Sequence, residues 1–381
     1  MVKQEKYDVV IIGGGLAGLS AAIQLAKLSR NVLLVEKESY PHHKVCGEYI
    51  SIESWDYLLL LGLDLENINP PKINRLLLSA PNGNSFTTKL EQGGFGMSRY
   101  FLDHALARIA ESCGVKIFSS TKVDDVKFLN EFKIKLSGAH AAEILSKSCI
   151  SAFGKRSNLD IKLNRKFLQS YDKKLQNFIG VKYHIHSDWP PDVIGLHNFK
   201  DGYCGISQIE SGKYCLCYLT TAANLRSAGG EIKSMEVSIL HKNPLLKEIF
   251  SAAVFEEGFP IAISQVSFVN KSGIEQHMLM TGDAAGMITP LCGNGMSMAL
   301  HSGKIAAMLT EDFLAGKISR EAMEKAYEVE WKAQFSRRMN AGRLLQRFFG
   351  SSSLSNGFVG LFQTFPALAA PVIRLTHGKP F

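Results

Sequence analysis

Cys46 is a residue whose type and setting could do chemistry, in the stretch HHKVCGEYIS from His42 to Ser51. A small polarisable thiol can pack against an alkene or donate a proton to one of its carbons. No second cysteine lies at the spacing of a zinc or redox pair, and His42 and His43 lack the spacing of metal ligands. We therefore predict no metal site here, and two roles stay open for Cys46: a chemical one, or packing alone.

The residues before Cys46 predict a nucleotide-binding βαβ unit. Val9–Ile12 is a β-branched run typical of a buried parallel strand, and a helix rich in alanine and leucine follows from Leu16 to Leu28. Between them, GGGLAG has the G-x-G-x-x-G register, which permits a tight turn, lets the backbone approach a pyrophosphate and brings the helix close to the strand. A second strand, Val32–Val35, ends at Glu36, about 20 residues beyond the glycines, where a carboxylate accepts hydrogen bonds from a ribose diol.

An acidic residue at that point favours an unphosphorylated ribose, so the unit predicts FAD or NAD, with a tight turn and no ligand as the alternative. The residues expected to contact the nucleotide are Gly13, Gly14, Gly15, Leu16, Ala17, Gly18, Glu36 and Lys37.

A second glycine-rich motif, MLMTGDAAGMITPLCGNGMSMAL, favours FAD over NAD. A short apolar strand, Met278–Met280, is followed by Gly282-Asp283, and a helix begins near Gly295. An aspartate at a strand end can hold the hydroxyl groups of a sugar alcohol, and the free amides at a helix start stabilise the negative charge of a reduced flavin. The expected contacts in this motif are Gly282, Asp283, Pro290, Gly293, Asn294, Gly295 and Met296.

The two motifs together resemble FAD enzymes of the p-hydroxybenzoate hydroxylase fold. That resemblance implies an extended FAD, with its adenosine at the first motif and its isoalloxazine at the second. It also implies that Arg99, in MSRYFLDHALARIAESCGVKIF, contacts the flavin phosphate and ribityl region, and that the strand at Val123 meets the adenine. A strand near residue 150 usually ends in Asp-Gly in this fold, whereas this chain has Phe153-Gly154. Gly154 stays a predicted cofactor contact, and the electron donor is either NAD(P)H or, because the acidic residue is missing, a separate reductase or carrier.

The opening stretch also resembles the geranylgeranyl reductase family, through Lys44-Val-Cys46-Gly47-Glu48 and an architecture that covers about Tyr7 to Leu314. In that family the cysteine sits over the flavin ring. The resemblance implies that Lys44, Cys46 and Gly47 contact the cofactor, that Cys46 is catalytic, and that a C=C bond of an apolar isoprenoid or polyene is reduced. Two alternatives stay open, an FAD-dependent monooxygenase of the same fold and a non-catalytic flavin-binding electron-transfer partner.

The predicted fold class is α/β, in three parts. Residues 1–72, 96–175 and 268–318 form a discontinuous Rossmann-type FAD-binding domain, and 73–95 and 176–267 form a substrate domain with an antiparallel sheet. Residues 319–381 form a C-terminal helical region. Asn82-Gly83, between alternating runs, is the hairpin signal of the substrate domain.

The C-terminal region carries most of the net charge of +8. From Trp331 to Phe381 there is no acidic residue, and the basic residues are Lys332, Arg337, Arg338, Arg343, Arg347, Arg374 and Lys379. The nearly neutral remainder argues against a nucleic-acid partner. A helix is expected to start near Ser319, with an apolar stripe interrupted by Arg338 and made of Trp331, Phe335, Met339, Leu345 and Phe349.

Two roles are open for this region. It either packs on the body and closes the pocket, or forms a basic, apolar edge at which a lipid substrate enters from a membrane. Seven cysteines without metal spacing, and an N-terminus that runs straight into a strand, favour the cytoplasm, including a peripheral position on the inner face of the membrane.

Overall fold

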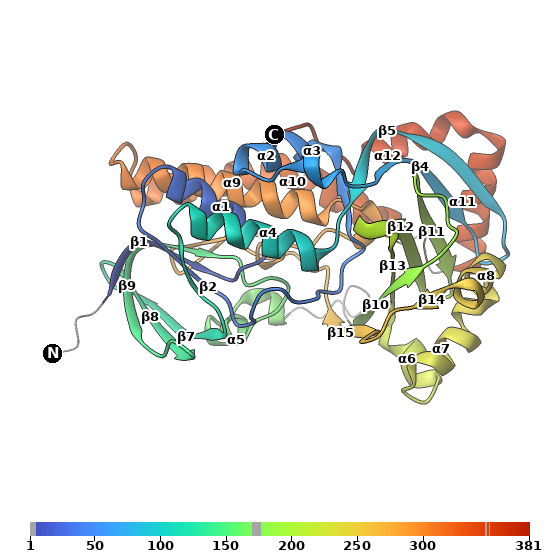
Figure 1. Cartoon of the computed structure of the whole chain (residues 1–381), viewed down its shortest axis with the longest axis horizontal. Coiled ribbons are helices and arrows are strands. Elements are labelled where there is room, and N and C mark those ends of the chain that lie inside the picture. Colours follow the sequence, from blue (N-terminus) through green and yellow to red (C-terminus); the bar gives the residue numbers. More distant parts are fainter. Residues whose placement is uncertain (1–4, 170–176, 347–348, 350) are drawn as a thin grey trace.

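The computed structural model describes residues 5–169, 177–346, 349 and 351–381. Two sheets lie end to end, with long helices along one side of the first sheet and shorter helices around the second (Figure 1). The predicted domain boundary at 175/176 and Arg347 lie outside the described residues.

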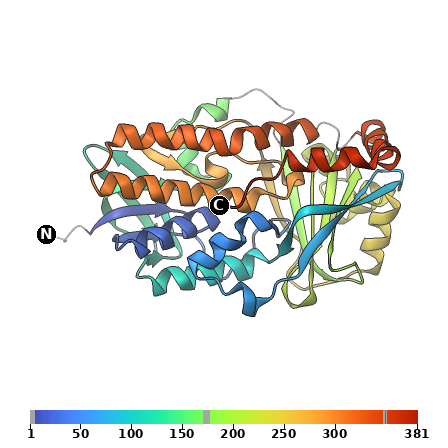
Figure 2. The same cartoon turned by 90° about the horizontal axis from the view of Figure 1, so that it is seen from above.

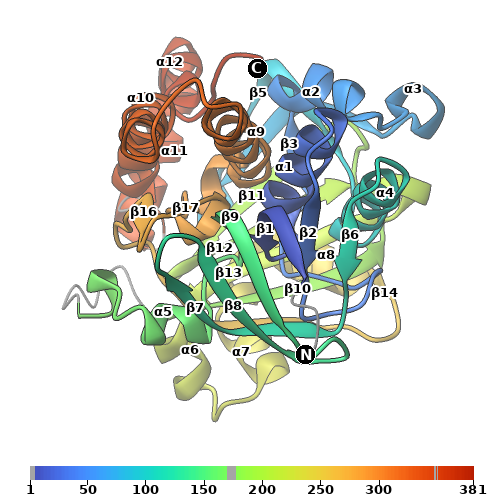
Figure 3. The same ribbon diagram turned by 90° about the vertical axis from the view of Figure 1, so that its left-hand side faces the viewer.

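The first sheet, sheet A, has a parallel centre of buried strands. Its strands are β16 (Ile274–Glu275), β17 (Met278–Met280), β9 (Glu143–Ser151), β1 (Lys6–Ile12), β2 (Val32–Val35) and β6 (Lys116–Phe118) in spatial order, with β7 (Thr121–Phe128) and β8 (Phe132–Gly138) continuing from β9. The predicted strands Val9–Ile12, Val32–Val35 and Met278–Met280 are confirmed. Helices α1, α4 and α9 cover one face of these strands (Figure 3), and buried side chains of β7 and β8 belong to the same hydrophobic core.

The helices of this half are α1 (Leu16–Lys27), α2 (Trp55–Leu61), α3 (Leu65–Ile68), α4 (Arg99–Ser112), α5 (Asn158–Lys162) and α9 (Gly295–Leu314). Gly18 allows α1 to approach the preceding turn, because a β-carbon there would lie 2.0 Å from the carbonyl oxygen of Gly13. The third glycine of the motif therefore has the packing role that the sequence predicts.

The second sheet, sheet B, is mixed rather than antiparallel. Its spatial order is β14 (Val254–Phe255), β10 (Phe178–His186), β13 (Tyr214–Thr221), β12 (Gly202–Gln208), β11 (Val193–Phe199), β4 (Lys72–Ser79), β5 (Ser85–Gly96) and β3 (Tyr49–Ser51), and β15 (Ile261–Val266) pairs with β10. The Asn82-Gly83 hairpin is confirmed, with Gly83 at φ +89°. The all-antiparallel expectation is wrong at one seam: the β4–β5 hairpin docks with β4 parallel to β11. Because β3 pairs with β5, segment 1–72 contributes to both sheets.

One face of sheet B looks toward the flavin-binding half and the C-terminal helices, and we call it the front face. Directly paired residues cross it in one row: Lys182, Cys217, Gly205, Leu196, Leu78 and Phe86. The row is polar at β10 and apolar at β4 and β5. The opposite face packs against three helices that the sequence analysis did not predict, α6 (Ala222–Ser227), α7 (Ile232–Ser238) and α8 (Pro244–Ala252).

The C-terminal region forms α10 (Arg320–Gln346), α11 (Ser352–Thr364) and α12 (Ala369–Arg374). Figure 2 shows α10 alongside α9, and α11 over sheet B. Trp331, Phe335 and Met339 are buried against the first half, as the stripe predicts. Within the described residues no single helix is long and apolar enough to cross a membrane. The pair Ser352–Thr364 and Pro366–Arg374, bent by 112°, meets those two criteria only when taken together.

Candidate functional site

Two cations flank the start of α1. Gly15 is its N-cap residue, and a β-carbon placed there would lie 3.5 Å from Arg99 Nη2 and 3.9 Å from Lys44 Nζ. Asp103 binds both: Arg99 donates at 2.7 and 2.8 Å to its two oxygens, and Lys44 donates at 2.9 Å. Burial raises the pKa of Asp103, but the charges of Arg99 and Lys44 lower it by a larger amount, so the net shift is downward. Helix amides and two oriented cations at one point match a pyrophosphate.

The end of β2 provides the carboxylate that a ribose would meet. Glu36 is buried, and its oxygens accept from the Gly14 N–H at 2.6 Å and the Glu38 N–H at 3.0 Å. The Tyr40 hydroxyl, which the sequence analysis missed, donates to the Gly14 carbonyl at 2.6 Å. β7 starts beside Glu36, through a bond from the Thr121 N–H to the Glu36 carbonyl at 3.0 Å, and this places the Val123 strand near the predicted adenosine site.

Lys37 does not join this group. Its side chain is exposed, and its ammonium lies 3.8 Å from the Glu38 carboxylate.

Asp283 is available for a ligand. Its carboxylate makes no hydrogen bond or close ion pair with a described residue, while the charges of Arg99, Lys155 and Lys271 act on it. The Lys271 ammonium donates to the carbonyls of both Lys155 and Asp283, at 2.8 and 2.9 Å, and so joins the Gly154 loop to the Gly282-Asp283 loop. Burial lowers the pKa of Lys271 to about 8.

The start of α9 offers free backbone amides. Gly293 has φ +63°, and the helix begins at Gly295 without a side-chain cap, so no cap side chain accepts from its first-turn N–H groups. Asn294 Nδ2 donates to the Thr376 carbonyl at 2.9 Å, which ties this loop to the C-terminal segment. Pro290 opens the short turn before it, and Met296 is buried in the core.

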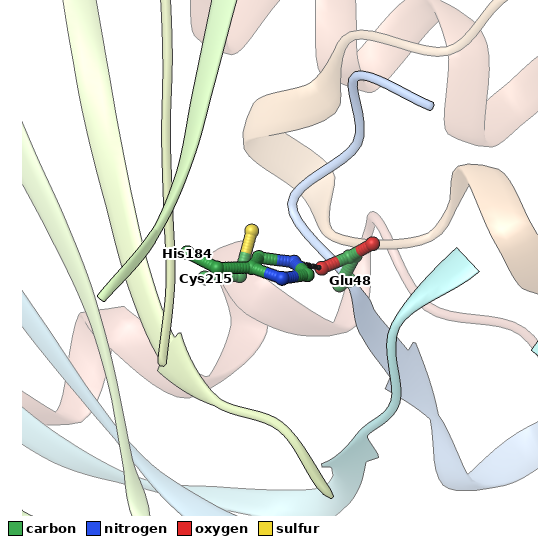
Figure 4. A group of neighbouring side chains, drawn as sticks. All are labelled: Glu48, His184 and Cys215. Atoms are coloured by element: carbon green, nitrogen blue, oxygen red, sulfur yellow. Dashed lines mark hydrogen bonds and ion pairs between the residues drawn. The ribbon is translucent and has the colours of Figure 1, made fainter. Parts of the chain in front are cut away.

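The Cys46 turn lies against the polar end of the front face. Cys46 is half-buried, and a β-carbon at exposed Gly47 would meet no atom within 4 Å. The next residue, Glu48, is fully buried. One of its oxygens accepts from Lys182 Nζ at 2.5 Å and from the Arg99 N–H at 2.7 Å, and the other is 2.7 Å from His184 Nε2 (Figure 4).

An apolar cavity of about 90 Å³ occupies the other end of the front face. Sheet B, the Leu291–Gly293 loop and the helices α11 and α12 enclose it, and its wall includes Leu78, Phe86, Leu196, Cys292, Phe358 and Phe362. Cys292 therefore borders this cavity, whereas Cys46 does not line it.

Sequence comparison gives the same cofactor as this geometry. A family profile described as "FAD binding domain" matches residues 8–45. Over 376 residues the chain is 25% identical to conditioned medium factor receptor 1 of Dictyostelium discoideum, covering 90% of this chain and 70% of that protein. It is 27% identical over 355 residues to digeranylgeranylglycerophospholipid reductase of Methanococcus vannielii (86% and 83% covered). It is 24% identical over 329 residues to menaquinone reductase of Mycobacterium tuberculosis (82% and 78% covered).

Solved structures show the same fold. The flavin-dependent brominase Bmp2 superposes with a TM-score of 0.77 at 22% identity, over 97% of this chain and 93% of that one. A geranylgeranyl bacteriochlorophyll reductase-like protein from Thermoplasma acidophilum superposes with a TM-score of 0.76 at 18% identity, over 98% and 100%.

The chain is an FAD-dependent flavoprotein, similar to the geranylgeranyl reductases. Its fold is that of the p-hydroxybenzoate hydroxylase-like enzymes.

The flavoprotein's own residues fit FAD. Arg99 and Lys44 at the α1 terminus would hold the pyrophosphate, Glu36 the ribose, and Asp283 the ribityl chain. The open space beside Gly47 and the free amides of α9 suit the ring. The predicted residues come together from the Cys46 turn, α4, the Gly-Asp loop and α9, which are far apart in sequence.

The sequence analysis missed Lys182 and His184, which lie two residues apart on one face of β10. Glu48, His184 and Cys215 bring ligand-type atoms within 4.8 Å of one another. Lys182 already binds the Glu48 carboxylate, however, and the Cys215 thiol donates to the Cys46 carbonyl at 3.2 Å. In this structure the Glu48 carboxylate is therefore part of an ion pair with Lys182, and burial raises the pKa of the Cys215 thiol well above its ordinary value.

Proposed function

We propose that this flavoprotein reduces a carbon–carbon double bond of an apolar isoprenoid or polyene lipid. The observation that carries the proposal is the cavity of about 90 Å³ beside the Leu291–Gly293 loop, because its walls are almost entirely aliphatic and aromatic. Such a lining favours an apolar hydrocarbon group over a small polar substrate. The names of the digeranylgeranylglycerophospholipid reductase and the menaquinone reductase, which are similar to this chain, support the substrate class.

Alkene reduction needs a hydride on one carbon and a proton on the other. Reduced FAD would supply the hydride. We assign the proton to Cys46, which lies at the other end of the front face from the cavity, so the lipid chain would extend along that face to reach it. Burial raises the pKa of the Cys46 thiol, so it is protonated at neutral pH. The product is the saturated bond, and a proton from solvent restores the thiol.

The backbone of the Cys46 turn is held in place for this task. Lys182 Nζ donates to the Lys44 carbonyl at 3.3 Å, the Cys215 thiol to the Cys46 carbonyl at 3.2 Å, and the Ser207 hydroxyl to the Gly47 carbonyl at 3.4 Å. Three contacts from sheet B leave Gly47 facing open space, which supports a cofactor ring next to the thiol.

For the electron source we propose a separate reductase or carrier rather than direct use of NAD(P)H. Phe153 stands where the acidic residue of the fold usually lies, and it packs half-buried against the core of the first half. An apolar ring there offers no carboxylate to a nicotinamide donor.

We further propose that the protein is cytoplasmic and contacts the inner face of a membrane through α11 and α12. The outward side chains there are apolar and 41–56% exposed: Leu354, Leu361, Phe365, Leu368 and Leu375. Exposed Arg337 and Lys379 lie in the same acid-free segment and suit anionic lipid, whereas the exposed Arg374 guanidinium is paired with the Glu91 carboxylate. The inner side of the same helices walls the apolar cavity, so a lipid tail would have a short path into it.

Anaerobic reoxidation tests the proposed reaction. The FAD-loaded protein is reduced with dithionite, and polyprenyl lipid is added in detergent. We expect the oxidised flavin absorbance to return with a stoichiometry of one lipid double bond per flavin. A flavin that stays reduced with each isoprenoid and polyene lipid, and reoxidises only with oxygen or a protein carrier, would favour the monooxygenase or the electron-transfer alternative.

A further inference from the structure

The residue after Gly47 has an unusual backbone. Glu48 adopts φ +56°, the left-handed region that residues with a side chain seldom enter, although it is fully buried. Such a conformation persists only where the surroundings fix it. Here the Met97 N–H donates to the Glu48 carbonyl at 3.0 Å, and three further groups hold the carboxylate.

The Glu48 carboxylate faces a fully buried ammonium. Lys182 Nζ lies 2.5 Å from Glu48 Oε1, and neither side chain is exposed at all. Burial opposes both charges, yet the pKa of Glu48 is lowered and that of Lys182 is raised, because each charge stabilises the other. The pair therefore stays ionised directly beneath the Cys46 turn, whose backbone Lys182 also binds.

The Cys46 thiol lies within the electrostatic reach of several groups on different elements. Burial is the largest influence on the Cys46 thiol and raises its pKa. On the same turn, the negative charge of Glu48 also raises this pKa, whereas a hydrogen bond from the Glu48 N–H lowers it. The charges of Arg99 on α4 and Lys182 on β10 lower that pKa. The other groups that interact with the thiol are Lys155, Cys215 and Cys217. Without the Glu48 carboxylate, the charges of Arg99 and Lys182 would no longer be opposed by it, and the pKa of the Cys46 thiol would fall.

We propose that Glu48 is a positioning residue for Cys46: its carboxylate neutralises Lys182, and its left-handed backbone sets the turn, so that the thiol is kept as a proton donor. The inference rests on the proposed function, in which Cys46 gives up a proton. The two residues have different roles. Lys182 binds the backbone of the turn, and Glu48 offsets the effect of the Lys182 charge on the pKa of the thiol.

Thiol alkylation tests the inference without any substrate. The oxidised, FAD-loaded protein is treated with iodoacetamide across a range of pH, and peptide mass spectrometry follows Cys46. Cys113, at the end of α4, is the reference thiol in the same sample. We expect Glu48→Gln to lower the pH midpoint of Cys46 alkylation by at least one unit, which raises the thiolate fraction at pH 7 about tenfold. The double variant Glu48→Gln/Lys182→Met should bring the midpoint back toward that of the unmodified sequence.

An unchanged midpoint in Glu48→Gln, or the same shift in the double variant, would overturn the inference. If Glu48→Gln does not fold, Lys182→Met alone decides: we expect a higher midpoint, and an unchanged one contradicts the account. These results are separate from the proposed reaction, because a protein that reduces no lipid can still show the predicted shifts, and a working reductase can lack them.

Discussion

The Arg338 guanidinium donates to Glu53 Oε1 at 3.0 Å, with side chains only 7% and 1% exposed. Arg338 lies on α10, and Glu53 follows β3, so the pair joins the C-terminal helices to the first half of the chain. The second Glu53 oxygen accepts from the Gly378 N–H at 2.6 Å. One buried carboxylate thus holds both α10 and the segment after α12.

We predict that Arg338→Met destabilises the protein by about 3–5 kcal/mol, because it leaves the Glu53 charge buried without its partner. Arg337→Met, on the neighbouring exposed position, is the matched control and should stay within about 0.5 kcal/mol. Urea unfolding at pH 7 measures both. Equal losses in the two variants would contradict the role of the ion pair.

The same residue shows where prediction from the sequence ends. The stripe Trp331, Phe335 and Met339 could be predicted, because helical periodicity is local, but Arg338 was only an irregularity in it. Its partner lies 285 positions earlier in the chain, and no pattern near either residue indicates the other. In contrast, the G-x-G-x-x-G and Gly-Asp motifs could be found in the sequence, because each motif consists of neighbouring residues.

The rest of the site depends on contacts between distant segments. Asp103, which joins Arg99 to Lys44, and Lys182, which meets Glu48, are ordinary charged residues in the sequence. The cavity requires the parallel docking of β4 on β11, which follows from tertiary packing and not from the hairpin's own pattern.

Asp103 should make stability depend on pH in the acid range. Its pKa in the folded protein is lowered, whereas an unfolded Asp titrates at about 3.9. Its ionised form therefore stabilises the fold above about pH 4, and this contribution is lost as the pH falls through the folded value. Asp103→Asn should be less stable at pH 7, by about 3–5 kcal/mol. The difference in the free energy of unfolding between this variant and the unmodified protein, measured by urea unfolding, should be smaller at pH 3. The same loss of stability at both pH values would contradict this role of Asp103. Asp125→Asn, at a half-exposed position, is the control.

Asp283→Ala should weaken FAD binding by about 1–3 kcal/mol, through lost hydrogen bonds to the cofactor. Asp312→Ala removes a half-exposed aspartate, paired with Lys317, near the far end of α9, and should leave the affinity for FAD unchanged. Titration of the apoproteins with FAD, followed by flavin fluorescence, gives both constants. Unchanged affinity in Asp283→Ala would remove this residue from the site.

Membrane contact should depend on the outward face of α11 and α12. We expect binding to anionic vesicles that weakens with salt, at about 1 kcal/mol per basic residue near the surface. The double variant Phe365→Ser/Leu368→Ser should bind less, and Leu129→Ser, at an exposed leucine between β7 and β8, should bind as before. Vesicle sedimentation reports the bound fraction, and equal binding to neutral and anionic vesicles would leave only the packing role for these helices.

Cys46→Ala should retain FAD but slow lipid reduction at least tenfold, an effect of about 1.4 kcal/mol on the barrier. Cys46→Ser keeps the size and a proton donor, and its rate of lipid reduction should fall between those of Cys46→Ala and the unmodified protein. Cys113→Ala, which changes another free cysteine, is the control. Single-turnover flavin reoxidation measures each rate. Turnover in Cys46→Ala equal to that of the unmodified protein would return Cys46 to packing.

Mass spectrometry of the lipid after one anaerobic turnover tests the central claim most directly. The reduced, FAD-loaded protein is incubated with a membrane lipid extract, and the lipids are compared with those from a sample containing oxidised protein. We predict an isoprenoid or polyene lipid that gains two hydrogens and loses one double bond. A lipid pool unchanged without oxygen, with an oxygen atom added once air is admitted, would contradict the reductase assignment.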